Sequence, residues 1–88
     1  TPLHIAAHKG HVKIVQLLVQ QNPDGRNDKD SDGMTPLMLA VLGGHEDVAS
    51  VLLLKGARVP DTDRQGRSSL HLAVEQGHES MLRLLLDH

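Results

Sequence analysis

Three aspartates at alternating positions are the first side chains in this sequence that could form a binding site. Asp28, Asp30 and Asp32 lead into Gly33, a spacing that imitates the start of a helix-flanked calcium-binding loop. Such a loop closes with a bidentate glutamate at its twelfth position, and the residue at that position, counted from Asp28, is Leu39. We therefore interpret the row as a solvated turn, with weak calcium binding as the alternative.

Histidine is the second candidate, because the chain has 7 histidines in 88 residues. His4, His8 and His11 are spaced so that one continuous helix would gather them into a metal site. Gly10 should end that helix before His11, which breaks the arrangement. We expect the histidines to act as structural hydrogen-bonding groups, and metal binding and pH sensing at the surface are the alternatives.

Other classes of chemistry lack the residues that they require. The absence of cysteine excludes disulfides, thiolate zinc sites and a cysteine nucleophile. Ser68 does not lie in a nucleophile-elbow motif, and Gly43-Gly44 is not followed by the lysine of a phosphate-binding loop. A net charge of −2 and the absence of Phe, Tyr and Trp argue against nucleic acid or a membrane as partner. We expect no enzymatic activity, no cofactor and no bound metal.

One motif, written three times, must position all of these side chains. It begins at Thr1 as TPLHIAAHKGH, at Thr35 as TPLMLAVLGGH and at Ser68 as SSLHLAVEQGH. This spacing predicts a single repeat domain over residues 1–88. The repeats are expected at approximately 1–33, 34–66 and 67–88.

Each unit should form two short helices followed by an extended turn. Thr35 can cap the first helix, with Pro36 at its first helical position. Gly56 should end the second helix in a left-handed conformation. Residues 57–67 show no helical period, and Asp63–Gly66 is typical of a hairpin turn.

These units resemble the ankyrin repeat. The resemblance implies an all-α repeat solenoid, in which helix–turn–helix pairs stack side by side and β-hairpin finger loops project from them. It also implies positive φ at Gly44 and Gly77, which follow the first helices of the second and third units. The matching segments are Thr1-Pro2-Leu3-His4, Ala6-Ala7, Gly10-His11, Ile14-Val15, Leu17-Leu18, Thr35-Pro36-Leu37, Gly44-His45, Val51-Leu52-Leu53, Gly56-Ala57, Leu70-His71, Gly77-His78 and Leu84-Leu85-Leu86.

Four departures from the family pattern predict local changes. Met38 replaces the motif histidine, so the bond from that ring to the capping threonine should be lost. Ser68-Ser69 keeps a capping hydroxyl but lacks the proline. Pro60 replaces the finger asparagine that Asn27 supplies one unit earlier, so a link between fingers should be missing there. Asn22, which tolerates positive φ, replaces the glycine that usually ends the second helix.

The resemblance implies a non-catalytic module that binds a protein or peptide partner through its finger tips and the concave face of its first helices. Met34 and Leu42 are expected to form a small exposed apolar patch, flanked by Arg64 and Arg67. The expected partner-binding residues are the ones that differ most between units. They are His8, Lys9, Ser31, Asp32, Met34, Leu42, Gly43, Arg64, Gln65, Arg67, Glu75 and Gln76.

Two other roles remain open at this stage. The chain could be a structural spacer within a longer array. We expect such an array because no finger precedes Thr1 and the chain stops at His88, where the third finger should begin. The family's finger asparagine can be hydroxylated by an iron- and oxoglutarate-dependent oxygenase, which would make Asn27 a substrate. We also expect an intracellular location, cytoplasmic and/or nuclear, within a larger multi-repeat or multidomain chain.

Overall fold

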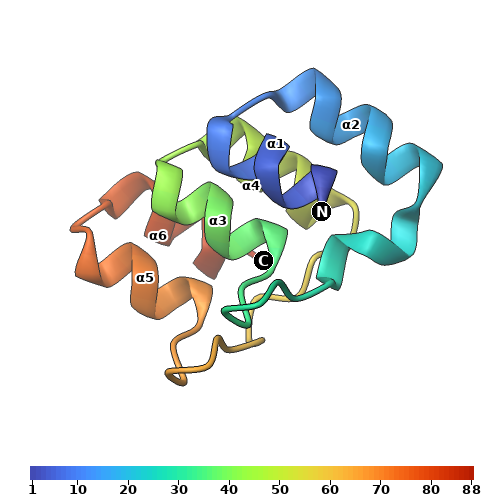
Figure 1. Ribbon diagram of the computed structural model, residues 1–88. Coiled ribbons are helices and arrows are strands. Elements are labelled where there is room, and N and C mark those ends of the chain that lie inside the picture. Colours follow the sequence, from blue (N-terminus) through green and yellow to red (C-terminus); the bar gives the residue numbers. More distant parts are fainter.

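The computed structural model describes residues 1–88 and consists of three helical pairs joined by two finger loops (Figure 1). We call the pair α1 and α2 unit one, the pair α3 and α4 unit two, and the pair α5 and α6 unit three. A short 3₁₀ helix, η1, follows α2. The bounds are α1 Pro2–Lys9, α2 Val12–Gln21, η1 Pro23–Asn27, α3 Pro36–Gly43, α4 Glu46–Leu54, α5 Ser69–Glu75 and α6 Glu79–Leu86.

The helices form two layers. The first helices α1, α3 and α5 pack side by side in one layer, and the second helices α2, α4 and α6 form the layer behind them (Figure 1). The finger loops lie beyond the amino ends of α3 and α5. This arrangement confirms the predicted all-α solenoid. None of the helices has the length and apolar character needed to cross a membrane.

Each first helix begins at a hydroxyl cap, as the sequence predicts. The side chains of Thr1, Thr35 and Ser68 accept the backbone N–H of the residue three positions later. Left-handed glycines follow the first helices, and Gly44 (φ 73°) and Gly77 (φ 65°) confirm the prediction for units two and three. The capping prediction succeeds because these signals are local and do not depend on packing.

The core is wholly aliphatic and is densest in unit two. Leu37, Met38, Val41, Val48 and Leu52 are all fully buried there, between the helices of units one and three. Met38 makes no side-chain hydrogen bond, so the ring-to-threonine bond is absent from unit two, as expected. Burial of a thioether in place of an imidazole is consistent with the loss of that polar link.

The prediction for Asn22 is wrong. Its φ is −140°, and every residue with positive φ in the chain is glycine. The reason is Pro23, whose ring restricts the backbone conformations open to the preceding residue. The chain then turns through η1 rather than through a glycine cap.

Candidate protein-interaction surface

Finger one is the turn over residues 28–34, and its shape is set by Asp30. The Oδ1 atom of Asp30 accepts the backbone N–H of Asp32 and of Met34, both at 2.9 Å. The N–H of Asp30 donates to the carbonyl of Met34 at 2.9 Å, which closes the loop. An aspartate that receives N–H bonds from residues ahead of it is a common device for fixing a tight turn. The alternating aspartates therefore make a turn, as the sequence indicates.

A histidine in unit one fastens finger one to the helices. His4 is buried in α1, and its Nε2–H donates to the carbonyls of Asp28 at 2.9 Å and Met34 at 3.0 Å. Its other ring nitrogen, Nδ1, accepts a hydrogen bond from the Thr1 hydroxyl. The ring thus joins the cap of α1 to the backbone of the loop, which is the structural role predicted for His4.

Finger two is the turn over residues 61–67, and it repeats the same backbone pattern. Oδ1 of Asp63 accepts the N–H groups of Gln65 and Arg67, both at 2.9 Å. Thr62 and Ser68 form a single antiparallel bridge at the base of this finger. The backbone N–H of Arg67 contributes most to lowering the pKa of Asp63, and the N–H of Gln65 and the Arg67 side chain lower it further, against the opposing effect of burial.

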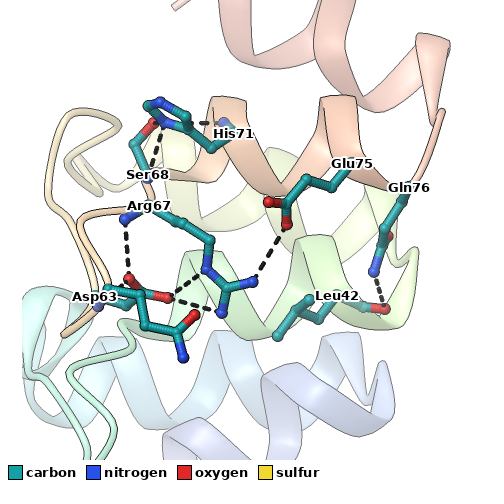
Figure 2. Close-up of polar contacts among 8 residues, drawn as sticks. Leu42, Asp63, Arg67, Ser68, His71, Glu75 and Gln76 are labelled. Carbon is teal, nitrogen blue, oxygen red and sulfur yellow. Dashed lines mark hydrogen bonds and ion pairs between the residues drawn. The ribbon is translucent and has the colours of Figure 1, made fainter.

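Arg67 connects finger two to α5 (Figure 2). Its guanidinium lies 3.1 Å from Oδ2 of Asp63 and 3.2 Å from Oε1 of Glu75. Next to this pair, the Gln76 amide donates to the carbonyl of Leu42 at 3.0 Å, which joins α5 to α3. Arg67, Glu75 and Gln76, all expected to face a partner, therefore already hold parts of this chain together.

Met34 and Leu42 do not form the exposed apolar patch that the sequence suggests. Both are half-buried and pack against the hydrophobic core. The turn of finger one places Met34 beside the helices, and α5 lies beside Leu42, so their apolar character serves packing. The aliphatic side chains of the first helices that are strongly exposed are Ile5 and Val74, in the outer units.

The remaining predicted residues are exposed and fall into two clusters. The finger tips are joined edge to edge, because the N–H of Arg64 donates to the carbonyl of Asp32 at 3.2 Å. The second cluster lies at the carboxyl ends of the first helices, about 10 Å away along an eight-residue helix. Ser31, Asp32, Arg64 and Gln65 form the tip cluster, and His8, Lys9 and Gly43 form the helix-end cluster.

A shallow hollow between α1 and α3 adjoins the helix-end cluster, where His8 and Lys9 line it. Its volume is about 340 Å³, and it extends from Asp30 in finger one to Lys9 at the end of α1. Ile5 and Leu39 contribute apolar side chains to its wall. The lining residues are Thr1, His4, Ile5, His8, Lys9, Asp30 and Leu39. This hollow was not predicted from the sequence, because Ile5 and Leu39 align with Leu72, which is buried in unit three.

Further hydrogen bonds join neighbouring units. Oδ1 of Asn27 accepts the N–H of Arg58 at 2.9 Å, so the finger asparagine does join neighbouring loops. Nε2–H of His45 donates to the carbonyl of His8 at 2.9 Å, a structural hydrogen bond of the kind predicted for the histidines. His78 instead accepts the N–H of Met81 within its own unit and makes no hydrogen bond to the preceding unit. No group of three or more metal-binding side chains comes together.

This helical-pair architecture, with its glycine-ended first helices and aspartate-fixed fingers, defines the class of repeat solenoids. The family described as ankyrin repeats (3 copies) matches residues 1–63 and 27–88, which together span the chain. The chain therefore belongs to the ankyrin repeat family. Ankyrin repeats are generally protein–protein interaction modules and are generally non-catalytic.

Relatives of varied kinds contain similar repeats. The chain is 48% identical over 59 residues to the human transient receptor potential cation channel subfamily A member 1, covering 65% of this chain and 5% of that protein. It is 44% identical over 59 residues to mouse ankyrin repeat and SAM domain-containing protein 6, covering 67% of this chain and 7% of that protein. It is 43% identical over 63 residues to the probable E3 ubiquitin-protein ligase XBOS33 of Oryza sativa subsp. japonica, covering 72% of this chain and 12% of that protein. The chain thus spans only a small part of these relatives.

Proposed function

We propose that this chain is a non-catalytic module that binds a protein or peptide partner through its finger tips and the carboxyl ends of its first helices. The observation that carries the proposal is the edge-to-edge joining of the two fingers at Asp32 and Arg64, which leaves their side chains exposed. Backbone contact fixes the spacing of the tips, and their side chains differ from one finger to the next. A fixed frame with variable side chains suits specific recognition.

Two unpaired cations give this surface its chemistry. Arg64 at the finger tips and Lys9 at the helix ends are exposed and take part in no ion pair within the chain. Lys9 lines the hollow that has Ile5 and Leu39 in its wall. A partner segment with an apolar side chain and nearby carboxylates fits this arrangement, since guanidinium and ammonium groups pair with carboxylates at interface rims.

Charge reversal on the two layers of helices tests the proposal. Arg64→Glu combined with Lys9→Glu should slow the association of such a partner and reduce its acceleration at low salt. The matched control is Lys13→Glu combined with Lys55→Glu, which makes the same change in net charge on the second-helix layer. Association rates measured at several salt concentrations compare the two variants. If the control slows binding and the Arg64 variant does not, the partner uses the opposite layer.

Arg67 is unsuited to this test, because its guanidinium holds finger two to Asp63 and Glu75. A change there would alter the finger itself as well as any contact with a partner. The spacer role, the hydroxylation of Asn27 and the intracellular location remain predictions. Mass spectrometry of the chain after treatment with an asparaginyl hydroxylase would test the second of these, with Asn27→Ala as the control.

A further inference from the structure

A groove lies between the second helices of units one and two, in the layer of helices opposite the proposed surface (Figure 1). Its volume is about 490 Å³, larger than that of the hollow between α1 and α3. Helix α2 forms one wall and α4 forms the other, so the groove is complete within this chain. We call it the outer groove, and its lining residues are Gln16, Gln20, Val51, Leu54 and Lys55.

The α4 wall of the outer groove presents an uncovered aliphatic side chain. Leu54 is 76% exposed, more than any other large aliphatic side chain in the molecule. Helix α4 already packs against a second helix on each side, α2 and α6, so neither neighbouring unit covers Leu54. Val51, one turn earlier on the same face of α4, is half-buried beside it. These two side chains give the groove an apolar wall, as binding sites for side chains of a partner have.

The α2 wall offers amide groups at a regular spacing. Gln16 and Gln20 are exposed and lie four positions apart, about 6 Å along the helix axis. Two residues of an extended peptide span about 6.6 Å, and the peptide groups along one edge of it repeat at that distance. Each glutamine amide can donate to a carbonyl and accept an N–H. The α2 wall therefore matches the backbone of an extended segment.

The end of the outer groove at the carboxyl end of α4 is positively charged. Lys55 lies there and takes part in no ion pair within the chain. Arg26 of η1 lies against the next residue, because a Cβ at Gly56 would be 3.3 Å from its Nε atom. That Nε is buried without a hydrogen-bond partner, and Arg26 forms no ion pair with Asp24 or any other carboxylate. Two cations that the chain leaves without a counter-charge favour an anionic group at this end.

This combination of apolar and cationic groups is particular to the outer groove. Both acidic residues of α4 are in its first turn, roughly 12 Å along the helix from Lys55. Between α4 and α6, repeat alignment places Asp87 at the position of Leu54 and His88 at the position of Lys55. A carboxylate there would repel an acidic segment, so the groove between α2 and α4 is the one suited to it.

We propose that the outer groove binds an extended acidic segment of a partner protein, at a second site that is independent of the finger tips. Val51 and Lys55 are four positions apart on α4, which again matches the span of two extended residues. The segment therefore has an apolar residue that packs on Val51 and Leu54. Two positions away, on the same side, it has an aspartate or glutamate that pairs with Lys55 beside Arg26. The amides of α2 bind its backbone.

Selection from a library of random dodecapeptides displayed on phage tests this composition. Peptides are selected in parallel on the unmodified chain and on the groove variant, Leu54→Gln with Lys55→Glu. Peptides retained only by the unmodified chain should have an apolar and an acidic residue two positions apart. The matched control is Leu86→Gln with Lys9→Glu, which makes the same two changes at exposed positions away from the groove. It should retain the same peptides.

Nuclear magnetic resonance places the contact on the molecule. The most enriched of these peptides, synthesised with blocked ends, is titrated into the ¹⁵N-labelled chain. Saturable shifts should appear at the side-chain amides of Gln16 and Gln20. The groove variant should raise Kd by more than about tenfold, because it removes an apolar anchor and reverses a charge. Leu54 and Lys55 are both exposed, so the variant should fold, and thermal unfolding checks this.

Three outcomes would overturn the proposal. The first is a selection in which the groove variant retains every enriched peptide. The second is a set of groove-dependent peptides that lack the acidic residue. The third is a set of peptides lost only on Arg64→Glu with Lys9→Glu, which would support the finger-tip surface and reject the outer groove. The two sites lie on opposite layers of helices, so either proposal can fail without the other.

Discussion

The two fingers have the same turn but are fastened to the helices by different chemistry. In each, an aspartate accepts two N–H bonds from the residues ahead of it, and a glycine with positive φ follows. Finger one is held through its carbonyls by the buried ring of His4. Finger two is held to α5 by the ion pair of Arg67 with Glu75, and Arg67 also pairs with Asp63 within the finger. The turn is therefore encoded locally, whereas its attachment depends on side chains elsewhere in the repeat.

Replacing the finger glycines should show how differently the two turns are enclosed. Gly33→Ala and Gly66→Ala both strain a backbone at positive φ, at a cost of roughly 1–3 kcal/mol each. Gly33→Ala should cost more, because its Cβ would lie 2.9 Å from the backbone nitrogen of Arg64, whereas nothing lies within 4 Å at Gly66. Urea unfolding measures both free energies. Equal losses would mean that finger two does not press on finger one.

The histidines of units one and three provide the second test. His4→Ala should destabilise the chain by about 1–3 kcal/mol, because the Asp28 carbonyl loses its partner, and the Met34 carbonyl and the Thr1 hydroxyl each lose one hydrogen bond. His71 is exposed and bonds only within its own capping motif at Ser68, so His71→Ala should cost about 0.5–1.5 kcal/mol. Thermal unfolding of the two variants compares them. A larger loss at His71 would contradict the anchoring role of His4.

The stability that finger two gains from Asp63 and Arg67 should depend on pH in the acid range. The pKa of Asp63 is lowered in the folded chain, so its stabilising effect is present above the unfolded pKa and is lost as the pH falls through the folded value. Arg67→Met gives finger two the residue that Met34 supplies at the same position of finger one. It removes the contribution of the Arg67 side chain to the lowered pKa of Asp63. The variant should be less stable at neutral pH, with a difference that shrinks in acid.

Urea unfolding at a series of pH values measures that difference. Asp63→Asn serves as the control, because it removes the titrating group and should flatten the acid dependence further than Arg67→Met does. A gap between Arg67→Met and the unmodified chain that stays constant down to strongly acidic pH would mean that the guanidinium acts by packing alone.

The smallest expected effect lies where each finger enters its helix. Finger one enters α3 through Thr35-Pro36, whereas finger two enters α5 through Ser68-Ser69. Ser69 is fully buried, and its hydroxyl has no hydrogen-bond partner. Ser68 already has the extended backbone that a following proline requires, at φ −94° and ψ 175°. Ser69→Pro should therefore stabilise the chain by about 0.4–1 kcal/mol, measured by thermal unfolding.

Sequence alone predicted the features whose causes are local. The caps at Thr35 and Ser68 and the positive φ of Gly44 and Gly77 followed from residue type and position in the repeat. The conformation of Asn22 was not predicted, because it depends on the following Pro23 as well as on the tolerance of asparagine for positive φ.

The candidate site was predicted less well, since exposure depends on what packs nearby. Met34 and Leu42 pack against the core, and Arg67 pairs with Asp63 and Glu75, so none of the three is free to face a partner. Ile5 occupies a core position in the repeat and yet lies in the wall of an open hollow. A repeat alignment gives the position of a side chain within its unit, but it does not show which neighbours surround it.

The side-chain hydrogen bonds that join units all connect neighbours, and the longest reaches across 37 residues, from His45 to His8. These hydrogen bonds couple each unit only to its nearest neighbours, so the stability of the array is a sum of the stabilities of the units and of the interfaces between them. Hydrogen exchange should therefore be graded along the array, slowest in α3, which has a neighbour on both sides, and faster toward α1 and α5. Under tension, such an array would lose its outer units first and extend in steps.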